Sequence, residues 1–330
     1  MKGLIKIFTV LTISILIAEF TMGHNVKGQP VLSQNLENKI IIVDIKGNGD
    51  FISIQEAIDS ASTGDTILLK KGKYPEIIDI IKKVNLIGEE MENTIINPTS
   101  KENKCAIKIR VNGVTIKNLT ITNKGPGIYS SGIQVLKSDT DINNCNFYDN
   151  PIGIVLWSSG NTVDNCKFWN CDDEGIVLIG TSSVPCENNK IKNCIFYDNC
   201  DGIELQYSSN NTISGCHFYN NSHTGIDAIA SSNNGNVISN CMIYNNRVHG
   251  VYLSSSSHNK IINCKISDNA NGDIIQRRGS FNNLVRSSFA KNIGTYFKER
   301  LTGFLNNIKT RLSNTQLFDD FVNLIDIHFS

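Results

Sequence analysis

The sequence predicts an all-β protein, a right-handed parallel β-helix (solenoid) with a short N-terminal helix cap and a C-terminal helical cap. A phrase of the form Asn-x-Ile/Val-x-Asn-Cys-x-Phe, followed by a polar turn and Gly-Ile-x-Leu, recurs along the middle of the chain. Copies begin at Asn161, Asn189, Asn211, Asn236 and Asn259. The period of about 21 to 28 residues indicates a repeat in which each copy forms one coil.

Within each copy, apolar residues alternate with polar ones. Lys167 separates Cys166 from Phe168, and Ile176 alternates with Leu178 after a glycine. A period of two indicates short strands with one buried face. One coil cannot bury its own apolar face, so successive coils must stack and pair their backbones.

Stacked coils would align equivalent residues into ladders with a spacing of about 4.8 Å. One expected inward ladder consists of Phe147, Phe168, Phe196, Phe218, Ile243 and Ile266, and a second consists of Cys145, Cys166, Cys194, Cys216, Cys241 and Cys264. The asparagines before most of these cysteines are expected at a bend, because Asn tolerates left-handed backbone. The glycine of each Gly-Ile pair is expected to relax the bend into the next strand.

The cysteines of the inward ladder are predicted to be buried free thiols, which act as small hydrophobic groups. Neighbouring coils would also bring them close enough to bridge, so pairing remains an alternative. Cys171 and Cys200 lie in turns after a strand and could pair. No Cys-x-x-Cys or Cys/His spacing indicates a zinc site.

Residues 1–23 are typical of a secretory signal peptide, with Lys2 and Lys6 before an apolar run that Glu19 interrupts. We therefore expect a secreted or cell-surface (extracellular or periplasmic) protein with no membrane span in the mature chain; an uncleaved anchor is the alternative. The β-helix is expected over residues 40–290. The chain has 31 basic and 31 acidic residues, so it has no net charge that would attract nucleic acid, and we expect no nucleic-acid partner. We also expect a monomer.

Both ends of the solenoid need covers. Ser53–Ser62 is predicted to be an amphipathic helix that plugs the N-terminal end. Residues 291–330 change to a helical apolar period and are predicted to form the C-terminal cap. A membrane-surface helix or a partner-docking tail is the alternative for this segment.

Together with the repeats, the stretch from Val43 to Ile80 resembles the pectate-lyase-like β-helix superfamily, in particular its NosD-type repeat proteins. The resemblance covers residues 40–290 and implies the β-helix fold. The superfamily includes lyases, hydrolases, esterases, epimerases and adhesins. The motifs Gly-Gln-Asp-Thr-Leu, Gly-His-Gly and Asp-Pro-His-Asp are absent, so no catalytic residues carry over from their families.

Functional groups are expected on the outward ladder that follows each Gly-Ile pair. That ladder is predicted to run Gln134, Val155, Val177, Glu204, Asp227, Tyr252, and the next outward position gives Trp157, Ile179, Gln206 and Ile229. The preceding bend supplies further groups: Asp172, Asp173, Glu174, Asp201, His223, Arg247 and His249. The rest of the repeat surface is expected to be mostly Asn, Ser and Lys.

Acid, base and cation are thus predicted to converge over about four coils. The candidate catalytic residues are Glu204, Asp227, Asp201, His223, Arg247 and His249, because two close carboxyls shift each other's pKa and suit acid/base or retaining-glycosidase chemistry. Trp157, Gln206 and Tyr252 are candidate substrate-binding residues. Asp172, Asp173 and Glu174 could hold Ca²⁺, which prefers several oxygen ligands.

Each of these assignments has an alternative in which the residues have a structural role and no function in catalysis or binding. Asp and Asn are favoured in turns for backbone reasons, so Asp172–Glu174 could be turn residues only. Glu204 and Asp227 could be a solvated outward pair, and the Thr181–Asn188 insertion could cover Trp157.

Two functions therefore remain open. The first is a secreted carbohydrate-active enzyme that contacts extracellular polysaccharide as a uronan lyase, epimerase or hydrolase. The second is a noncatalytic carbohydrate-binding or surface-structural protein. Low charge and abundant Asn and Ser suit a surface that hydrogen-bonds to sugars.

Overall fold

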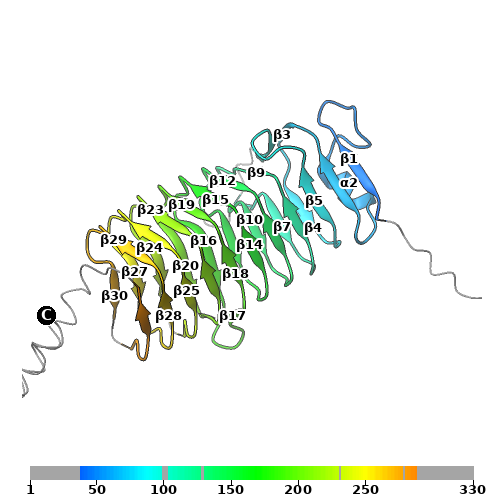
Figure 1. Ribbon diagram of the computed structural model, residues 1–330. Coiled ribbons are helices and arrows are strands. Elements are labelled where there is room, and N and C mark those ends of the chain that lie inside the picture. The colour runs from blue at the N-terminus through cyan, green and yellow to red at the C-terminus, as the bar shows by residue number, and fades with distance from the viewer. Residues whose placement is uncertain (1–37, 99–102, 128–129, 230–231, 278, 288–330) are drawn as a thin grey trace, which may run out of the picture. The chain divides into compact units, whose positions relative to one another are not determined.

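The protein is a right-handed parallel β-helix, as the sequence predicts. The structure is a computed structural model and describes residues 38–98, 103–127, 130–229, 232–277 and 279–287. Figure 1 shows the coils stacked one behind the next, each contributing strands to three long parallel sheets. The predicted signal peptide (1–23) and C-terminal helical cap (291–330) lie outside the described residues. Within the described ranges, no helix is long and apolar enough to cross a membrane.

The three long sheets are named A, B and C here. Sheet A contains, in spatial order, β1 (Ile40–Val43), β2 (Thr66–Leu69), β5 (Asn85–Gly88), β8 (Thr115–Lys117), β11 (Asp141–Asn143), β14 (Thr162–Asp164), β18 (Lys190–Lys192), β22 (Thr212–Ser214), β25 (Val237–Ser239), β28 (Lys260–Ile262) and β31 (Leu284–Arg286). Sheet B contains β3 (Gly72–Tyr74), β6 (Thr94–Ile96), β9 (Thr120–Ile121), β12 (Asn146–Tyr148), β15 (Lys167–Trp169), β19 (Ile195–Tyr197), β23 (His217–Tyr219), β26 (Met242–Tyr244) and β29 (Lys265–Ser267). Sheet C contains β4 (Ile78–Ile80), β7 (Ile107–Ile109), β10 (Ile133–Val135), β13 (Ile154–Leu156), β16 (Glu174–Ile179), β20 (Asp201–Gln206), β24 (Thr224–Ala228), β27 (His249–Leu253) and β30 (Ile274–Gln276). A short pair, β17 (Cys186–Glu187) with β21 (Ser208–Ser209), completes the strands.

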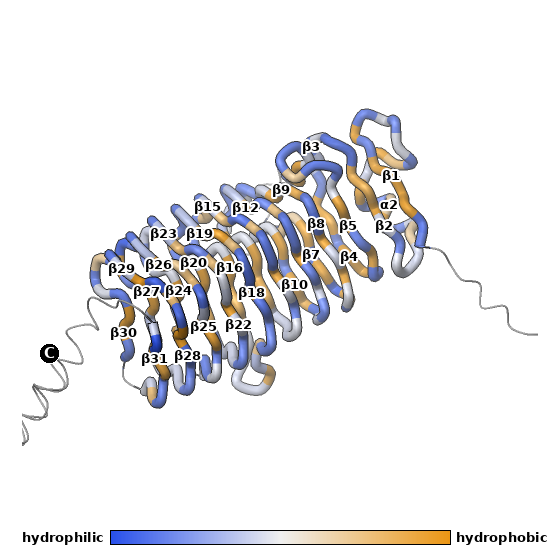
Figure 2. The backbone as a smooth tube through the Cα atoms, in the orientation of Figure 1, coloured by the Kyte–Doolittle hydropathy of each residue, from blue (hydrophilic) through white to orange (hydrophobic). Residues whose placement is uncertain are grey.

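The core of the solenoid is a set of ladders whose members come from successive coils. Phe147, Phe168, Phe196 and Phe218 stack with centroid distances of 4.8, 4.8 and 4.7 Å and nearly parallel rings, which confirms the predicted aromatic ladder. Ile243 and Ile266 continue it in register. In Figure 2, hydrophobic strand segments alternate with hydrophilic turns along the coils, as expected for a shell around one continuous core.

The six ladder cysteines are buried free thiols, as predicted. All ten cysteines lie in the described residues and all are free, so the alternative pairing of Cys171 with Cys200 does not occur. Each ladder thiol donates to a backbone carbonyl two residues earlier; the Cys194 Sγ, for example, lies 3.0 Å from the Lys192 oxygen. Burial raises the pKa of the Cys171 thiol to about 12, which makes it a poor nucleophile at neutral pH.

Asparagine serves the coils in two ways. The predicted bend residues Asn144, Asn165 and Asn193 have φ angles of 51°, 51° and 52°, so the left-handed conformation is confirmed. The first asparagine of the repeat was not predicted to be buried, yet it forms an internal amide ladder. The Asn161 Nδ2 donates to the Asn189 Oδ1 at 3.0 Å, and the Asn189 Nδ2 donates to the next asparagine in the same way. Such a chain satisfies buried amides that would otherwise be costly.

The repeated glycines have a different role from the one predicted. Gly202 does not have a positive φ angle, so it does not relax a bend. A Cβ added there would lie 2.5 Å from the Gly225 carbonyl oxygen and 2.5 Å from the Phe218 ring. Glycine is therefore required because the next coil and the aromatic ladder leave no space for a side chain.

The outer surface of sheet B also differs from the prediction of Asn, Ser and Lys. Half-buried aromatic rings stack along it with centroid distances of 5.1, 5.9, 5.3 and 5.4 Å, in the order Tyr148, Trp169, Tyr197, Tyr219 and Tyr244. The in-register stacking of coils explains this second ladder, since equivalent outward residues meet just as inward ones do.

The predicted N-terminal helix is present as α2 (Ile54–Ser60). Ser53 caps it by accepting a hydrogen bond from the Glu56 backbone N–H, and Ile54, Ala57 and Ile58 are buried. The helix contacts β1, β2 and β4 at the first coils, which is the place expected of a cap.

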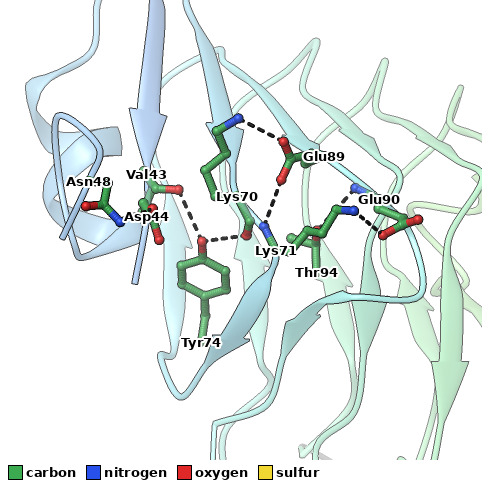
Figure 3. Close-up of polar contacts among 9 residues, drawn as sticks. All are labelled: Val43, Asp44, Asn48, Lys70, Lys71, Tyr74, Glu89, Glu90 and Thr94. Atoms are coloured by element: carbon green, nitrogen blue, oxygen red, sulfur yellow. Dashed lines mark hydrogen bonds and ion pairs between the residues drawn. The ribbon is translucent and has the colours of Figure 1, made fainter. Parts of the chain in front are cut away.

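Polar contacts tie these first coils together (Figure 3). The buried Tyr74 hydroxyl lies 2.7 Å from the Lys70 carbonyl oxygen and 3.1 Å from that of Val43. Burial raises the pKa of Tyr74 to about 12, so the phenol remains a neutral hydrogen-bonding group. Lys70 also forms an ion pair with Glu89 of the next coil at 2.8 Å.

Candidate active site

The outward ladder of sheet C has the predicted register. Val177 of β16 lies opposite Glu204 of β20, Glu204 lies opposite Asp227 of β24, and Asp227 lies opposite Tyr252 of β27. On the earlier coils, Gln134 lies opposite Val155 and Val155 opposite Val177. The parallel pairing of the coils thus brings two carboxyls onto adjacent strands, although 23 residues separate them in the chain.

These carboxyls are buried, which corrects the alternative of a solvated pair. Glu204 is 7% exposed and Asp227 is 4% exposed. Glu174 and Asp201, which lie opposite one another at the start of β16 and β20, are 5% and 4% exposed. We call Asp173, Glu174, Asp201, Glu204 and Asp227 the carboxyl cluster.

A histidine from the next bend joins the carboxyl cluster. The His223 Nδ1 lies 2.8 and 3.1 Å from the two oxygens of Asp201 and 3.9 Å from the Asp227 Oδ2. The Thr224 backbone N–H donates to the Asp201 Oδ1 at 2.6 Å, which fixes that carboxyl. One ligand atom from each of Asp201, His223 and Asp227 lies within 4.8 Å of the others, so these three residues could hold a metal ion.

Burial and mutual repulsion shift the titration of the carboxyl cluster upward. Burial, followed by the charges of Asp201 and Glu204, raises the pKa of Asp227 to about 7. Burial and the neighbouring Asp173 raise the pKa of Glu174 to about 9. Burial also raises the pKa of Glu204. Protonated and ionised carboxyls therefore coexist at neutral pH, which is the condition for acid/base catalysis.

Several buried atoms of this face lack a hydrogen-bond partner among the described residues. They are the Glu174 Oε2, the Thr224 Oγ1, the Asp227 Oδ1 and the His249 Nδ1. Buried polar groups are normally hydrogen-bonded, so these four atoms are free to contact a bound molecule at this face.

Comparisons with known proteins agree with the fold. Residues 84–235 match the family described as the right-handed beta helix region, and residues 182–308 match the family described as periplasmic copper-binding protein (NosD). Pectate lyase Pel9A superposes with a TM-score of 0.54 at 16% identity, covering 78% of this chain and 80% of that one. The chain has the right-handed β-helix fold that this pectate lyase also has.

Other solved structures resemble this β-helix protein at similar levels. ORF18 of Geobacillus virus E2 gives a TM-score of 0.58 at 17% identity, over 76% of this chain and 62% of that one. The periplasmic alginate epimerase AlgG gives 0.54 at 14% identity, over 69% of this chain and 61% of that one. These identities show a shared fold.

One curated relative matches part of the sequence. Probable pectinesterase 67 of Arabidopsis thaliana is 30% identical over 109 residues, which are 29% of this chain. The match spans about a third of the pectinesterase, 32% of its length.

Some predicted site residues of the β-helix protein stay outside the cluster. Arg247 is exposed and forms no ion pair with any described residue. Asp172 is also exposed, whereas Asp173 and Glu174 belong to the carboxyl cluster, in which Asp173 contributes to raising the pKa of both Glu174 and Glu204. Among the described residues, the group whose ligand atoms converge is Asp201, His223 and Asp227, and it includes none of the residues of the predicted Ca²⁺ site at Asp172–Glu174.

The remaining predicted residues lie along the same face. Gln206 donates a hydrogen bond from its Nε2 to the Glu204 Oε1. His249 and Tyr252 stack with a centroid distance of 5.3 Å, and burial followed by the charges of His223 and Arg277 lowers the pKa of His249. Trp157 is 40% exposed, so the Thr181–Asn188 insertion does not cover it.

Arg277 is a residue of this face that sequence reasoning missed. Its Cζ lies 6.0 Å from the centre of the Tyr252 ring, and its backbone N–H donates to Leu253 of the preceding coil. The residue falls just beyond the last well-formed repeat, where the Gly-Ile anchor no longer marks the register. Counting from β27 to β30 would have found it.

Proposed function

We propose that the protein is a polysaccharide-acting enzyme whose acid/base pair is Glu204 and Asp227. The observation that carries this proposal is the pairing of two buried carboxyls directly opposite one another on adjacent strands. Adjacent strands lie about 4.8 Å apart, close to the separation of about 5 to 5.5 Å between the carboxyls of retaining glycosidases. Glycoside hydrolysis is therefore the reaction that the geometry supports best.

In this reaction Asp227 acts as the acid. Its carboxyl gives a proton to the glycosidic oxygen as the bond to the sugar carbon breaks, and Glu204 attacks that carbon from the opposite face. Water, deprotonated by Asp227, then displaces Glu204 and restores both groups. The raised pKa of Asp227, about 7, and the unpartnered Asp227 Oδ1 support the acid role. The hydrogen bond from Gln206 orients Glu204.

A polysaccharide is the substrate class that suits the surroundings of this pair. The stacked coils extend sheet C on both sides of the carboxyl cluster, so a chain of sugars could lie across several coils. Trp157, two coils before Glu204, offers an exposed ring for a sugar to stack on. Pectate lyase Pel9A and the alginate epimerase AlgG share this fold and act on such chains. Secretion, expected from residues 1–23, would place the protein with extracellular polysaccharide.

A second candidate is a cation-assisted uronan lyase or epimerase. The observation that favours it is the close approach of Asp201, His223 and Asp227, which could hold a divalent cation. Removal of the proton next to a uronate carboxylate requires a base and a positive charge to stabilise the product. Because Arg247 is not part of the site, a bound cation would supply that charge. The imidazole ligand favours a transition metal over Ca²⁺.

Product analysis on a panel of oligosaccharides separates these possibilities. Hydrolysis adds water across the bond, elimination leaves an unsaturated uronate that absorbs ultraviolet light, and epimerisation leaves chain length unchanged. Glu204→Gln and Asp227→Asn should abolish turnover and preserve binding. Asp149→Asn, a shape-preserving change at a half-buried carboxylate in the turn after β12, is the matched control. Unimpaired turnover in both site variants would place the chemistry elsewhere. Binding without turnover on any glycan would favour the noncatalytic alternative.

Dialysis against a chelator completes the experiment. A hydrolase built on the carboxyl pair should retain activity, and a cation-assisted lyase should lose it. Restoration by a specific divalent ion would then identify the metal.

A further inference from the structure

We propose that the outer surface of sheet B binds a neutral, extended polysaccharide chain along the solenoid axis, with about one sugar on each coil. The binding surface, called the tyrosine track here, consists of Trp169, Tyr197, Tyr219 and Tyr244 with the bend residues Asp198, Asn220 and Asn245. It lies on a different sheet from the carboxyl cluster, so it goes beyond the proposed function and does not depend on it.

The tyrosine track follows directly from the repeat. The residue after each inward Phe or Ile of sheet B points outward, and in four successive copies it is aromatic: Trp169, Tyr197, Tyr219 and Tyr244. The strands that carry these rings, β15, β19, β23 and β26, lie one behind the next (Figure 1). The ring planes of neighbours differ by 5°, 4° and 8°. Each ring covers the face of the next, so the open part of the ladder is its row of edges.

The ring edges carry polar atoms that are open to a ligand. The Trp169 Nε1 and the hydroxyls of Tyr197, Tyr219 and Tyr244 form no hydrogen bond with any described residue, and they remain accessible to solvent. Burial, followed by the neighbouring phenol, raises the pKa of Tyr197 and of Tyr219. The phenols therefore stay protonated, and each can donate as well as accept a hydrogen bond.

A second open row of polar groups runs beside the rings. Asp198, Asn220 and Asn245 each follow a ring directly and have φ angles of 57°, 56° and 56°, so the backbone presents all three side chains in the same way. All three are exposed, and none forms a side-chain hydrogen bond with a described residue. At the other asparagine bend the amides are linked instead, as where the Asn144 Nδ2 donates to the Asn118 Oδ1 at 2.7 Å. The bends after sheet B thus leave one amide or carboxyl group available on each coil.

The tyrosine track has a defined start and end. At the start, Lys124 pairs with Asp149 at 2.9 Å and Asn170 donates to the same carboxylate, so the bend there is occupied. At the end, Ser267 lies opposite Tyr244 and the aromatic row stops. Four rings lie between these points, which sets the binding length at about four sugars.

Spacing and charge together select the kind of polymer. The ring centres lie between 5.3 and 5.9 Å apart, close to the rise of one pyranose in an extended β-linked chain, whereas side chains on one face of an extended peptide recur about every 6.7 Å. On the outward positions and following bends of β15 to β29, Lys167 and Lys265 balance Asp198 and Asp268. A surface without net charge does not attract nucleic acid or another polyanion. A neutral sugar chain, whose hydroxyls both donate and accept, matches the two rows.

The test compares two hexasaccharides of identical composition: cellohexaose, which is β-linked and extended, and maltohexaose, which is α-linked and coiled. Affinities are measured by titration calorimetry on the full chain. We expect cellohexaose to bind about tenfold more tightly, and shorter cello-oligosaccharides to gain affinity with length up to about four units. Tyr197→Phe and Tyr219→Phe keep the stacked rings and remove one hydroxyl each, so each should weaken cellohexaose binding about three- to tenfold. Tyr207→Phe, the same change at a half-buried tyrosine outside sheet B, is the matched control.

Tryptophan fluorescence locates the bound sugar, because the chain has two tryptophans and one of them lies in the tyrosine track. In a Trp157→Phe background, the emission of Trp169 should change with the same dissociation constant that calorimetry gives. The proposal fails if neither hexasaccharide binds, if maltohexaose binds as tightly as cellohexaose, or if cellohexaose binds without a change in Trp169 emission. A dimer in sedimentation that Tyr219→Arg breaks would mean that a second copy covers sheet B, and it would also overturn the proposal.

Failure of this inference is distinguishable from failure of the proposed function. Glu204→Gln and Asp227→Asn should leave binding to the tyrosine track unchanged, because both residues lie on sheet C. Cellohexaose binding that is lost in these variants and kept in Tyr197→Phe would place the sugar on sheet C and refute the track alone. Binding at the track without turnover of any glycan would refute the enzyme and retain the track.

Discussion

The buried carboxyl of Glu174 should make the protein less stable as the pH rises, and Glu174→Gln should remove much of that dependence. Burial and Asp173 raise the folded-state pKa of Glu174 to about 9, against 4.5 for an unperturbed glutamate. The folded state thus holds a proton that the unfolded state releases. The stability contribution is complete below about pH 4.5 and is lost progressively as the pH rises toward 9.

The size of the effect follows from the interval between the two pKa values. An interval of about 4.5 pH units, at about 1.36 kcal/mol per unit, gives an upper limit of about 6 kcal/mol. Relaxation of the coils, entry of water and coupling to Asp173 will reduce this figure, and we expect about 2 to 3 kcal/mol between pH 5 and pH 9. Glutamine has the same shape and carries no charge, so the variant should be the more stable protein at pH 9.

The assay is urea unfolding followed by circular dichroism from pH 4 to pH 9, in a chelator, for wild type and Glu174→Gln. Asp149→Asn is the control, because the Asp149 carboxyl should make the protein more stable, not less stable, as the pH rises. Lys124, 2.9 Å away, lowers the pKa of Asp149, so this carboxylate stabilises the protein above its ordinary pKa and ceases to do so as the pH falls. Parallel pH profiles for wild type and Glu174→Gln would refute the reasoning, because they would mean that the Glu174 carboxyl is solvated.

Three further outcomes follow from the ladders. Phe196→Ala opens a cavity between two rings that stack at 4.8 and 4.7 Å, and should cost about 3 to 5 kcal/mol in thermal or urea unfolding. Gly202→Ala should also destabilise, by about 1 to 3 kcal/mol, because its Cβ would meet the Gly225 backbone oxygen at 2.5 Å. Gly127→Ala is the control, because Gly127 has no positive φ angle and its Cβ would meet only the Asn103 side chain, at 3.1 Å. The six ladder cysteines should resist a thiol reagent until the protein unfolds and then all react; mass spectra showing bridges before unfolding would contradict the free-thiol ladder.

Much of the fold could be predicted from the repeat alone. A period of two indicates strands, and a strand too short to bury its face alone must pair with the next copy. Counting from the Gly-Ile pair was enough to place Glu204 opposite Asp227, and the pairing of β20 with β24 confirms that register. The inward Phe and Cys ladders follow from the same counting, because the register of a parallel strand pair fixes the face of the sheet to which each side chain points.

The same logic did not reveal the two additional ladders. The repeat phrase contains Asn161 and its equivalents at a fixed position, yet they were not predicted to be buried. Their burial depends on the amide chain that only stacked coils can form. Tyr197 and Tyr219 stack outside for a related reason, since they meet only when the coils align.

The carboxyl cluster itself required the tertiary structure. In a strand, alternation fixes the direction of a side chain, whereas in a bend each direction depends on local φ and ψ angles that the repeat does not specify. His223 turns toward Asp201, while Arg247 of the next bend turns to solvent. The sequence thus determined which coils carry the functional groups, and the folded bends determined which of those groups meet and how far burial shifts their pKa values.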